Sequence, residues 1–280
     1  MSVGLVLEGG AMRALYSAGV LDVFLDHGVR VDGVTAVSAG ACFGANLLSG
    51  QRGRGLRYNK KYMRDPRYMG LRSLLTTGDI VNREFGYYRI THELDPFDEE
   101  AFERYGADYE VVVTNVETGE AEYIRMTNIF EQMEAMRASA SMPFVSRMVE
   151  YGGKKYLDGG IADSIPVRAC LERGYDRIAV ILTRPADYRK GPMNPWLIRT
   201  VYGRYPNLCR TLIDRHNRYN AQCKDVAQLE REGRIFVIRP SSALGVRRLE
   251  KDPEVLQRVY DRGVQDGEAA MERLTAYLRG

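Results

Sequence analysis

The sequence predicts an α/β fold with three layers, α/β/α, around a mainly parallel central sheet. Over the first 50 residues short apolar strands alternate with helices, as in a parallel sheet that helices cover on both faces. The 280 residues, 45% of them hydrophobic and 28% charged, are enough for one large domain with a sizeable core. Because no internal repeat or long flexible linker divides the chain, we expect a single domain over 1–280.

The first two β-turn-α units are the most regular part of the sequence. The apolar run over 3–7 predicts a strand, which Gly9 and Gly10 separate from a helix over 11–27. Gly28 suits the position just after a helix end. A second strand over 33–37 turns sharply at Ser38 into a helix of small residues that runs to Leu48.

The later elements follow from apolar runs and turn residues. Strands are expected over 109–114, 121–124, 145–149, 155–157, 178–182 and 235–238, and helices over 129–140 and 252–278. The turn residues Thr118-Gly119 and Gly152-Gly153 predict two hairpins. The stretch from 73 to 108 indicates no particular element.

Composition excludes several classes of protein. A net charge of +3 gives no support to a nucleic-acid partner. Four scattered cysteines without a CxxC pair, together with three histidines, do not suggest a disulfide scaffold or a zinc site. The first residues do not resemble a signal peptide, and no apolar stretch reaches the length of a membrane span. We therefore expect reduced thiols, no bound metal and a cytoplasmic location.

Residues 51–72 are unusually basic, with eight cations and one acid, Asp65. The cations are Arg52, Arg54, Arg57, Lys60, Lys61, Arg64, Arg67 and Arg72, and three tyrosines and Met69 lie between them. One interpretation is peripheral contact with an anionic membrane, at its inner face. The other is a solvated connection whose charge is balanced by acids elsewhere, such as those over 93–103. The sequence leaves both open.

Three short segments indicate chemistry, and the first is Glu8-Gly9-Gly10-Ala11-Met12-Arg13. A strand that ends in glycines before a helix leaves backbone N–H groups unpaired at the positive end of that helix, where an anion can bind. A tight turn without a ligand is the simpler interpretation. The segment lacks the GxGxxG spacing of dinucleotide-binding proteins, and the chain has no phosphate-binding loop of the GxxxxGK[ST] type.

The second segment, from Ala36 to Gly40, has the arrangement of a nucleophile elbow around Ser38. Small neighbours let strand and helix approach closely while the turn exposes the serine oxygen at the sheet edge. The usual first glycine is Ala36 here. Alone, such a serine is more often a helix N-cap.

The third segment, Asp158-Gly159-Gly160, follows a predicted strand. It can place a carboxylate at the edge of the sheet where the strands end. An ordinary Asp-Gly turn is the simpler interpretation. All three segments in this order are much harder to obtain by chance than any one of them.

Together the segments resemble those of the patatin-like phospholipases, particularly the small bacterial members. That family has a glycine-rich oxyanion segment with a following arginine, an early GxSxG serine and a later aspartate in a DG[AG] motif. The resemblance places the nucleophile at Ser38, the proton acceptor at Asp158 and the oxyanion segment at Gly9 to Arg13. Residues 137–143 and 158–166 extend the likeness, which covers about 3–183.

The resemblance implies a patatin-like fold and a serine acyl hydrolase of the phospholipase A or lysophospholipase type. Such an enzyme uses a Ser-Asp dyad and an acyl-enzyme, with a lipid or other acyl ester as substrate and no cofactor. This chemistry is compatible with the residues present. Residues 184–280, which lie outside the likeness, are expected to form a helical extension packed on the core.

Three alternatives remain open at this stage. One is a catalytically weak protein that binds acyl lipids, and another is a nucleotide-binding α/β protein that uses the Gly9-Gly10 turn. The third is a histidine triad, for which His216 follows Ser38 and Asp158 in the right order. We expect His216 to lie on an exposed helical face over 214–218, His27 at a helix end and His92 in a loop or at a helix start, all without a catalytic role.

Overall fold

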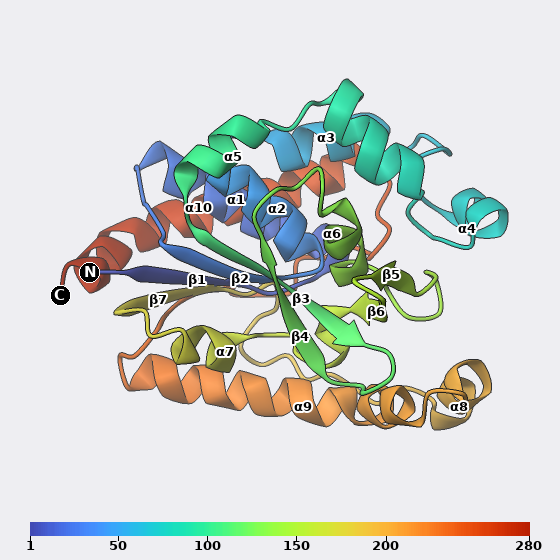
Figure 1. Cartoon of the computed structure of the whole chain (residues 1–280). Helices are drawn as coiled ribbons and strands as arrows, with labels where there is room; N and C mark the ends of the chain where they lie inside the picture. Colours follow the sequence, from blue (N-terminus) through green and yellow to red (C-terminus); the bar gives the residue numbers. More distant parts are fainter.

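A computed structural model describes all 280 residues and shows one mixed sheet of eight strands (Figure 1). The strands are β1 (Val3–Leu7), β2 (Gly33–Val37), β3 (Asp108–Asn115), β4 (Ala121–Met126), β5 (Val149–Tyr151), β6 (Lys154–Asp158), β7 (Arg177–Ile181) and β8 (Phe236–Ile238). Their order is β5-β6-β3-β2-β1-β7-β8, with β4 paired to β3. The pairs among β3, β2, β1, β7 and β8 are parallel, and β4, β5 and β6 are antiparallel to their neighbours. The expected mainly parallel sheet is confirmed.

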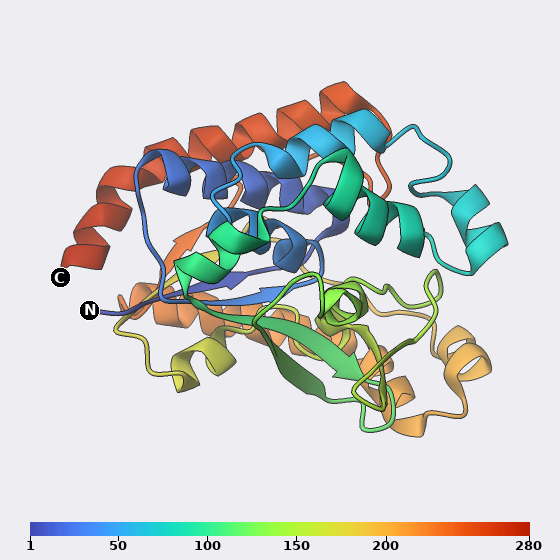
Figure 2. The same cartoon turned by 45° about the horizontal axis from the view of Figure 1, so that its top comes forward.

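Helices cover both faces of this sheet, so the three-layer α/β/α fold is confirmed (Figures 1 and 2). One layer contains α1 (Leu15–Asp26), α2 (Ala39–Leu48), α3 (Arg54–Tyr62), α5 (Glu99–Tyr105), α6 (Met133–Ser139) and α10 (Pro253–Arg279). The other contains α7 (Val167–Glu172) and α9 (Pro206–Arg231). The short helices α4 (Leu71–Thr77) and α8 (Pro195–Tyr202) lie at the end of the molecule opposite the amino terminus. None of these helices has both the length and the apolar character that crossing a membrane requires.

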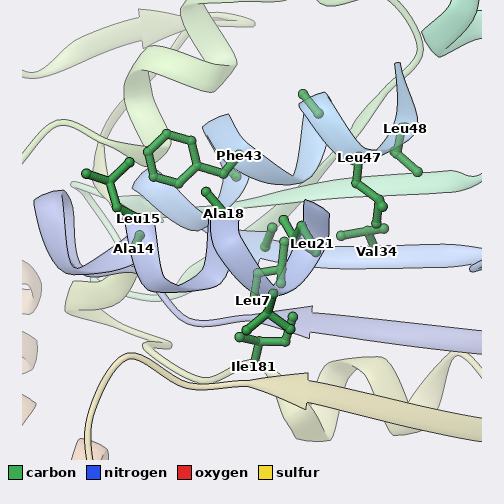
Figure 3. Packing of buried hydrophobic residues seen from close by; sticks show 14 of the residues in the cluster. Leu7, Ala14, Leu15, Ala18, Leu21, Val34, Phe43, Leu47, Leu48 and Ile181 are labelled. Carbon is green, nitrogen blue, oxygen red and sulfur yellow. The ribbon is translucent and has the colours of Figure 1, made fainter. Parts of the chain in front are cut away.

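The core consists of two apolar layers, one on each face of the sheet. Side chains alternate between faces along a strand. Leu5 and Leu7 of β1 therefore pack with α1, α2 and α10, whereas Val6 packs with α7 and α9 on the other side. Figure 3 shows Leu7 and Ile181 beneath the packed side chains of α1 and α2. Each fully buried aliphatic side chain contributes about 2 kcal/mol of apolar burial, so the central strands hold the sheet edge, and the loops on it, in place.

Most expected elements are confirmed, and two predictions were wrong in their bounds. The strand expected over 145–149 is reduced to β5, because Val145 accepts a hydrogen bond from the Ile80 N–H (2.7 Å) and Arg147 N–H donates to the Asp79 carboxylate (2.7 Å). The helix expected from 129 begins only at Met133. The Glu99 carboxylate accepts the N–H of Ile129 at 2.6 Å and so holds that residue in a turn. In both cases contacts with residues far along the chain override the local pattern.

The stretch from 73 to 108, where the sequence indicated no element, is largely helical. It contains the end of α4, the π-helix η2 (Arg83–Leu94) and α5. Beyond residue 184 the chain forms α8, α9, β8 and α10. β8 extends the central sheet beside β7, and α10 lies along α1. Two 3₁₀ helices, η1 (Ala11–Ala14) and η3 (Gly159–Ile161), begin at the turns that carry the first and third motif segments.

Candidate active site

Ser38 occupies a strained turn between β2 and α2. Its backbone has φ 57° and ψ −128°, a conformation that L-residues rarely adopt and that costs of order 1–3 kcal/mol. The Ser38 N–H donates to Ser139 Oγ at 2.9 Å, which anchors the turn from α6. At Gly40 a Cβ atom would lie 2.7 Å from the Glu8 carbonyl oxygen, so only glycine lets α2 begin this close to the end of β1. The sharp strand-to-helix turn that the sequence predicts at Ser38 is therefore present.

Asp158 reaches Ser38 because β6 pairs with the same edge of β3 as β2 does, beginning at the residue of β3 directly after the last one that pairs with β2. β2 pairs with β3 as far as Val37, which lies opposite Val112. The next residue of β3, Val113, lies opposite Asp158, the last residue of β6. β4 occupies the other side of β3 throughout this region. The carboxyl ends of β2 and β6 therefore point toward each other at one position of the sheet.

The two side chains are joined by a direct hydrogen bond. Ser38 Oγ donates to Asp158 Oδ2 at 2.8 Å, and the Gly160 N–H donates to Asp158 Oδ1 at 2.8 Å. Ser38 and Asp158 are 7% and 5% exposed. The sequence suggested a hydroxyl exposed at the sheet edge, and the structure corrects this, because the surrounding loops bury both groups.

Burial raises the pKa of Asp158 above the ordinary carboxyl value. The positive charge of Arg215 acts in the opposite direction, as do the hydrogen bonds from Ser38 and Gly160. An aspartate with a raised pKa is a stronger base than a solvated one. It is therefore better suited to accept the proton of a serine hydroxyl.

Arg215 corrects the prediction of an exposed helical face over 214–218. Its guanidinium Nε donates to the Gly160 carbonyl oxygen at 2.6 Å, in the turn that follows Asp158. The sequence could not show this, because α9 is amphipathic along its whole length and the side facing the sheet depends on how the helix packs. Arg215 thus connects α9 to the turn after Asp158, and its charge acts on the carboxylate without a direct bond.

The turn after Asp158 requires a glycine at its first position. A Cβ at Gly159 would lie 2.1 Å from the Val112 carbonyl oxygen, a contact that no side chain can make. Thr114 Oγ1 donates to the Asp158 carbonyl oxygen at 2.9 Å and holds the same turn. The backbone of Asp158 is therefore fixed independently of its carboxylate.

The first motif segment lies directly beside Ser38. A Cβ atom at Gly9 would lie 2.9 Å from the Ser38 Cβ. The N–H groups of Gly9 and Gly10 donate no hydrogen bond within the protein. Ala11 has a positive φ of 49° and begins η1, while Met12 is buried and Arg13 is partly buried. The segment therefore presents unpaired backbone donors next to the serine.

Ser38 lies where two cavities meet. The first has a volume of about 120 Å³, and 19 of its 25 lining residues are hydrophobic, among them Met12, Tyr58 and Met136. The second, of about 550 Å³, is polar and extends past Asp158 toward α9. The residues that line both are Ala11, Ser38, Met142, Arg248 and Leu249. A molecule bound across Ser38 therefore has an apolar end and a polar end.

The basic stretch over 51–72 carries less free charge than its sequence suggests. Ion pairs join Arg52 to Asp26, Arg54 and Arg57 to Asp95, and Arg67 to Asp65. Four other cations of the stretch form no ion pair, namely Lys60, Lys61, Arg64 and Arg72. The paired cations fit a solvated connection whose charge is balanced by acids, and the four unpaired cations are free for contact with an anionic membrane.

No histidine forms a hydrogen bond or an ion pair with Ser38 or Asp158, although His216 lines the same polar cavity. His27, at the end of α1, interacts with Glu268 at 2.9 Å, as its sequence position suggested. His92 lies inside η2 and not in a loop, and its ring packs on Phe130 with centroids 4.2 Å apart. His216 is half-buried, and its Nδ1 lies 3.1 Å from the Ile213 carbonyl oxygen of its own helix. No group of three or more metal-ligating side chains comes together in the structure.

Glu8 begins the first motif segment, but the sequence indicated no role for its carboxylate, which the structure buries. Glu8 accepts hydrogen bonds from the Thr183 N–H (2.6 Å) and the Tyr219 hydroxyl (2.8 Å). It thereby joins the ends of β1 and β7 to α9. A carboxylate directly after a buried strand was the only available signal, and its partners lie more than 170 residues away.

Comparison with known proteins assigns both halves of the chain to family models. The model described as patatin-like phospholipase matches residues 5–171, and a domain of unknown function (DUF6363) matches residues 205–279. Ser38 and Asp158 lie inside the first match, whereas Arg215 lies inside the second. The polar cavity is therefore built from both.

Several curated proteins are similar in sequence. The uncharacterized protein YjjU of Escherichia coli strain K12 is 25% identical over 251 residues, which cover 86% of this chain and 69% of YjjU. The lysophospholipase NTE1 of Debaryomyces hansenii is 29% identical over 201 residues, or 69% of this chain. That match spans only 12% of the yeast protein. Among solved structures, VipD from Legionella pneumophila aligns with a TM-score of 0.43 and 12% identity, covering 96% of this chain and 67% of VipD.

Proposed function

Because the chain belongs to the patatin-like phospholipase family, we propose that it is a serine acyl hydrolase that cleaves lipid esters with Ser38 and Asp158. The family supports hydrolysis of lipids as the general activity. The dyad, the acyl-enzyme and the carboxylic-ester specificity are our proposal. The observation that carries it is the 2.8 Å hydrogen bond from Ser38 Oγ to Asp158 Oδ2, beside the unpaired N–H groups of Gly9 and Gly10.

In the first half of the reaction, Ser38 Oγ attacks the ester carbonyl carbon while Asp158 Oδ2 takes the hydroxyl proton. Negative charge then develops on the carbonyl oxygen, and the N–H groups of Gly9 and Gly10 donate hydrogen bonds to it. They belong to the oxyanion segment from Gly9 to Arg13, in which the Arg13 N–H is already bonded to the Gly10 carbonyl oxygen. One such donor is worth about 3 kcal/mol in the transition state. The C–O bond to the alcohol breaks, and the alcohol leaves with the proton from Asp158.

In the second half, water attacks the acyl-serine carbonyl. Asp158 takes a proton from this water and returns it to Ser38 Oγ as the fatty acid leaves. The reaction thus consumes one ester and one water and yields one acid and one alcohol. Strain at Ser38 and the Ser139 contact keep the oxygen in place for both halves.

The two cavities support a substrate of the lysophospholipase or phospholipase A type. An acyl chain suits the apolar cavity, in which methionines and aromatic side chains provide an adaptable lining. The alcohol part of the ester would then occupy the polar cavity. The similarity to yeast lysophospholipases points in the same direction, although this chain spans about an eighth of their length.

Peripheral contact with an anionic membrane is also part of the proposal. The four unpaired cations of 51–72 support it. So do apolar side chains that the fold leaves exposed on α4 and α8, namely Leu71 (67%), Leu75 (77%) and Trp196 (72%). Figures 1 and 2 place α4 and α8 at the same end of the molecule. Tryptophan and leucine next to cations are typical of surfaces that enter a lipid interface.

Labelling with a fluorophosphonate tests the proposal. This reagent should modify the wild-type protein once, at Ser38, and should leave the Ser38→Ala variant unlabelled, with peptide mass spectrometry locating the adduct. Ser242→Ala removes an exposed serine that lies outside both cavities; it is the matched serine control and should still be labelled at Ser38. A protein that binds acyl lipids without turnover, or one that binds nucleotides, would show no labelling at Ser38 and would refute the proposal.

A further inference from the structure

The polar cavity beside Ser38 contains far more positive than negative charge. Its lining includes two carboxylates, Glu8 and Asp158, and five cations. The cations are Arg13, Arg184, Lys190, Arg215 and Arg248. They come from η1, from the segment after β7, from α9 and from the loop before α10, so the fold gathers them from distant parts of the chain.

None of the five cations forms an ion pair within the protein. The 21 ion pairs of the structure involve other residues. Glu8 is occupied by Thr183 and Tyr219, and Asp158 by Ser38 and Gly160. With Lys190 protonated, the cavity therefore has an excess of three positive charges over its two carboxylates.

Two of these cations have buried nitrogen atoms without a partner. Arg13 Nε and Arg184 Nε are inaccessible to solvent and make no hydrogen bond. Burial lowers the pKa of Arg13, and the charge of Arg184 lowers it further, so the two guanidinium groups repel each other. A buried guanidinium nitrogen without a hydrogen-bond partner is costly, and an anionic ligand that accepts its hydrogen bond removes that cost.

Lys190 is a further cation of the polar cavity without an ion pair. Its ammonium group lies 4.0 Å from the centroid of the Tyr219 ring and has no carboxylate within ion-pair distance. Burial and then the charge of Arg215 lower the pKa of Lys190 to about 7. An anion in the cavity would favour the charged form of this lysine.

We infer that the cavity lined by Arg184, Lys190 and Arg248 binds the anionic, phosphate-bearing headgroup of the ester substrate. This inference rests on the proposed function, because Ser38 joins this cavity to the apolar one. Guanidinium groups bind phosphate oxygens in pairs, and lysine provides a further charge. The three cations lie outside residues 5–171, so this specificity would belong to the part of the chain that follows the phospholipase match.

Three esters with the same octanoyl chain test the inference below their micellar concentrations. They are lysophosphatidylglycerol, which is anionic, lysophosphatidylcholine, which is zwitterionic, and monoacylglycerol, which is neutral. The wild type should hydrolyse the anionic ester with the highest kcat/KM. The ratio of kcat/KM for the anionic ester to that for the neutral ester should fall about tenfold in Arg184→Gln and in Lys190→Gln.

Arg199→Gln on α8 and Lys224→Gln on α9 are the matched controls, because both side chains are exposed and lie outside the cavity. They should keep the wild-type ratio, and Arg184→Lys should keep most of it, which separates loss of charge from misfolding. An unchanged ratio in Arg184→Gln and Lys190→Gln would overturn the inference, because these cations would then not distinguish an anionic headgroup from a neutral one.

Binding to the inactive Ser38→Ala variant distinguishes this failure from failure of the proposed function. Calorimetry should show lysophosphatidylglycerol binding more tightly than monoacylglycerol, with the preference lost in Ser38→Ala/Arg184→Gln. Equal binding of the two lipids would overturn the headgroup site. Absence of turnover of all three esters by the wild type, with this binding preference intact, would instead refute the hydrolase proposal alone.

Discussion

Ser38 and Asp158 are 120 positions apart in the sequence, but the strands that carry them end at neighbouring positions of the sheet. Val37, the residue before Ser38, lies opposite Val112 of β3, and Asp158 lies opposite the next residue, Val113. This arrangement places the serine after β2 within hydrogen-bond distance of the last residue of β6. The antiparallel β6 can join the parallel part of the sheet here because β2 ends, which leaves the same edge of β3 free for pairing with β6. The candidate catalytic pair is thus a consequence of the strand order.

The first prediction concerns the dyad. Ser38→Ala and Asp158→Asn should each reduce kcat for a p-nitrophenyl ester about 10³-fold or more, because an amide cannot accept the serine proton. The double variant should be within about threefold of Ser38→Ala, since the two residues act as a unit. Circular dichroism should show the native fold in each variant.

His216→Ala is the control for a histidine triad and should change kcat only a few-fold, because His216 forms no hydrogen bond with Ser38 or Asp158 and its Nδ1 lies beside the Ile213 carbonyl oxygen. Strong loss in His216→Ala with activity retained in Asp158→Asn would contradict the dyad.

The second prediction is a pH profile. Asp158 must be ionised to accept the proton, and burial raises its pKa. Activity should therefore fall as the pH decreases through a midpoint above the usual aspartate value of about 4. Removing the Arg215 charge in Arg215→Met should move this acid limb of kcat/KM to still higher pH, because that charge favours the carboxylate.

Arg215→Lys, which keeps the charge, should leave the limb near its wild-type position. An acid limb at the same pH in Arg215→Met and in the wild type would show that Arg215 does not influence Asp158 electrostatically.

The third prediction concerns Gly159. In Gly159→Ala the new methyl group would meet the Val112 carbonyl oxygen, so the turn after Asp158 must move. We expect a loss of about 3 kcal/mol in the free energy of unfolding, measured with urea, and loss of most esterase activity. Gly191→Ala is the matched control for stability, because a Cβ there meets no atom within 4 Å, and it should leave the free energy of unfolding unchanged. Equal stability of both variants would argue against the close approach.

The fourth prediction concerns the membrane surface. Leu75→Glu and Trp196→Glu should reduce sedimentation with anionic vesicles several-fold, because each removes an exposed apolar side chain and adds a negative charge. Stability should change by no more than about 0.5 kcal/mol, as is usual at exposed sites. Gln265→Glu on α10 adds the same charge elsewhere and should leave binding unchanged. Vesicle binding that is equal in all four proteins, or insensitive to salt, would contradict this surface.

The fifth prediction tests the charge of Lys190 in the headgroup cavity. Five groups face its ammonium from the elements around it. They are Arg215 and Tyr219 of α9, Glu8 directly after β1, Arg13 of η1 and Asp158 of β6. With a pKa of about 7 the lysine is charged at pH 6 and largely neutral at pH 8. Lysophosphatidylglycerol, whose phosphodiester keeps one charge over this range, should bind Ser38→Ala more tightly at pH 6 than at pH 8.

The variant Ser38→Ala/Lys190→Met isolates the contribution of this one group. Its affinity for the same lipid, measured by calorimetry, should be weaker than that of Ser38→Ala at pH 6 and should differ less between the two pH values. The same pH dependence with and without Lys190 would assign the effect to another group.

The sequence by itself determined the local structure around the candidate site. The apolar run over 3–7, the small residues around Ser38 and the glycines after Asp158 are local signals, because strand propensity and turn chemistry depend on neighbouring residues. They were sufficient to predict both strands, the elbow and the identity of the two candidate residues. They were not sufficient over 145–149 and at the start of α6, where hydrogen bonds to distant residues replace the local pattern.

Only the tertiary structure decided how those local pieces meet. Three features depend on contacts between residues that are far apart in the sequence. β6 pairs with β3 directly beyond β2, Arg215 lies beside the turn after Asp158 and not in solvent, and five cations without ion pairs line one cavity. The physical reason is that a helix or strand pattern shows which side is apolar but not which partner will cover it. The partner depends on the packing of the whole chain, and so does the cationic character of the cavity next to Ser38.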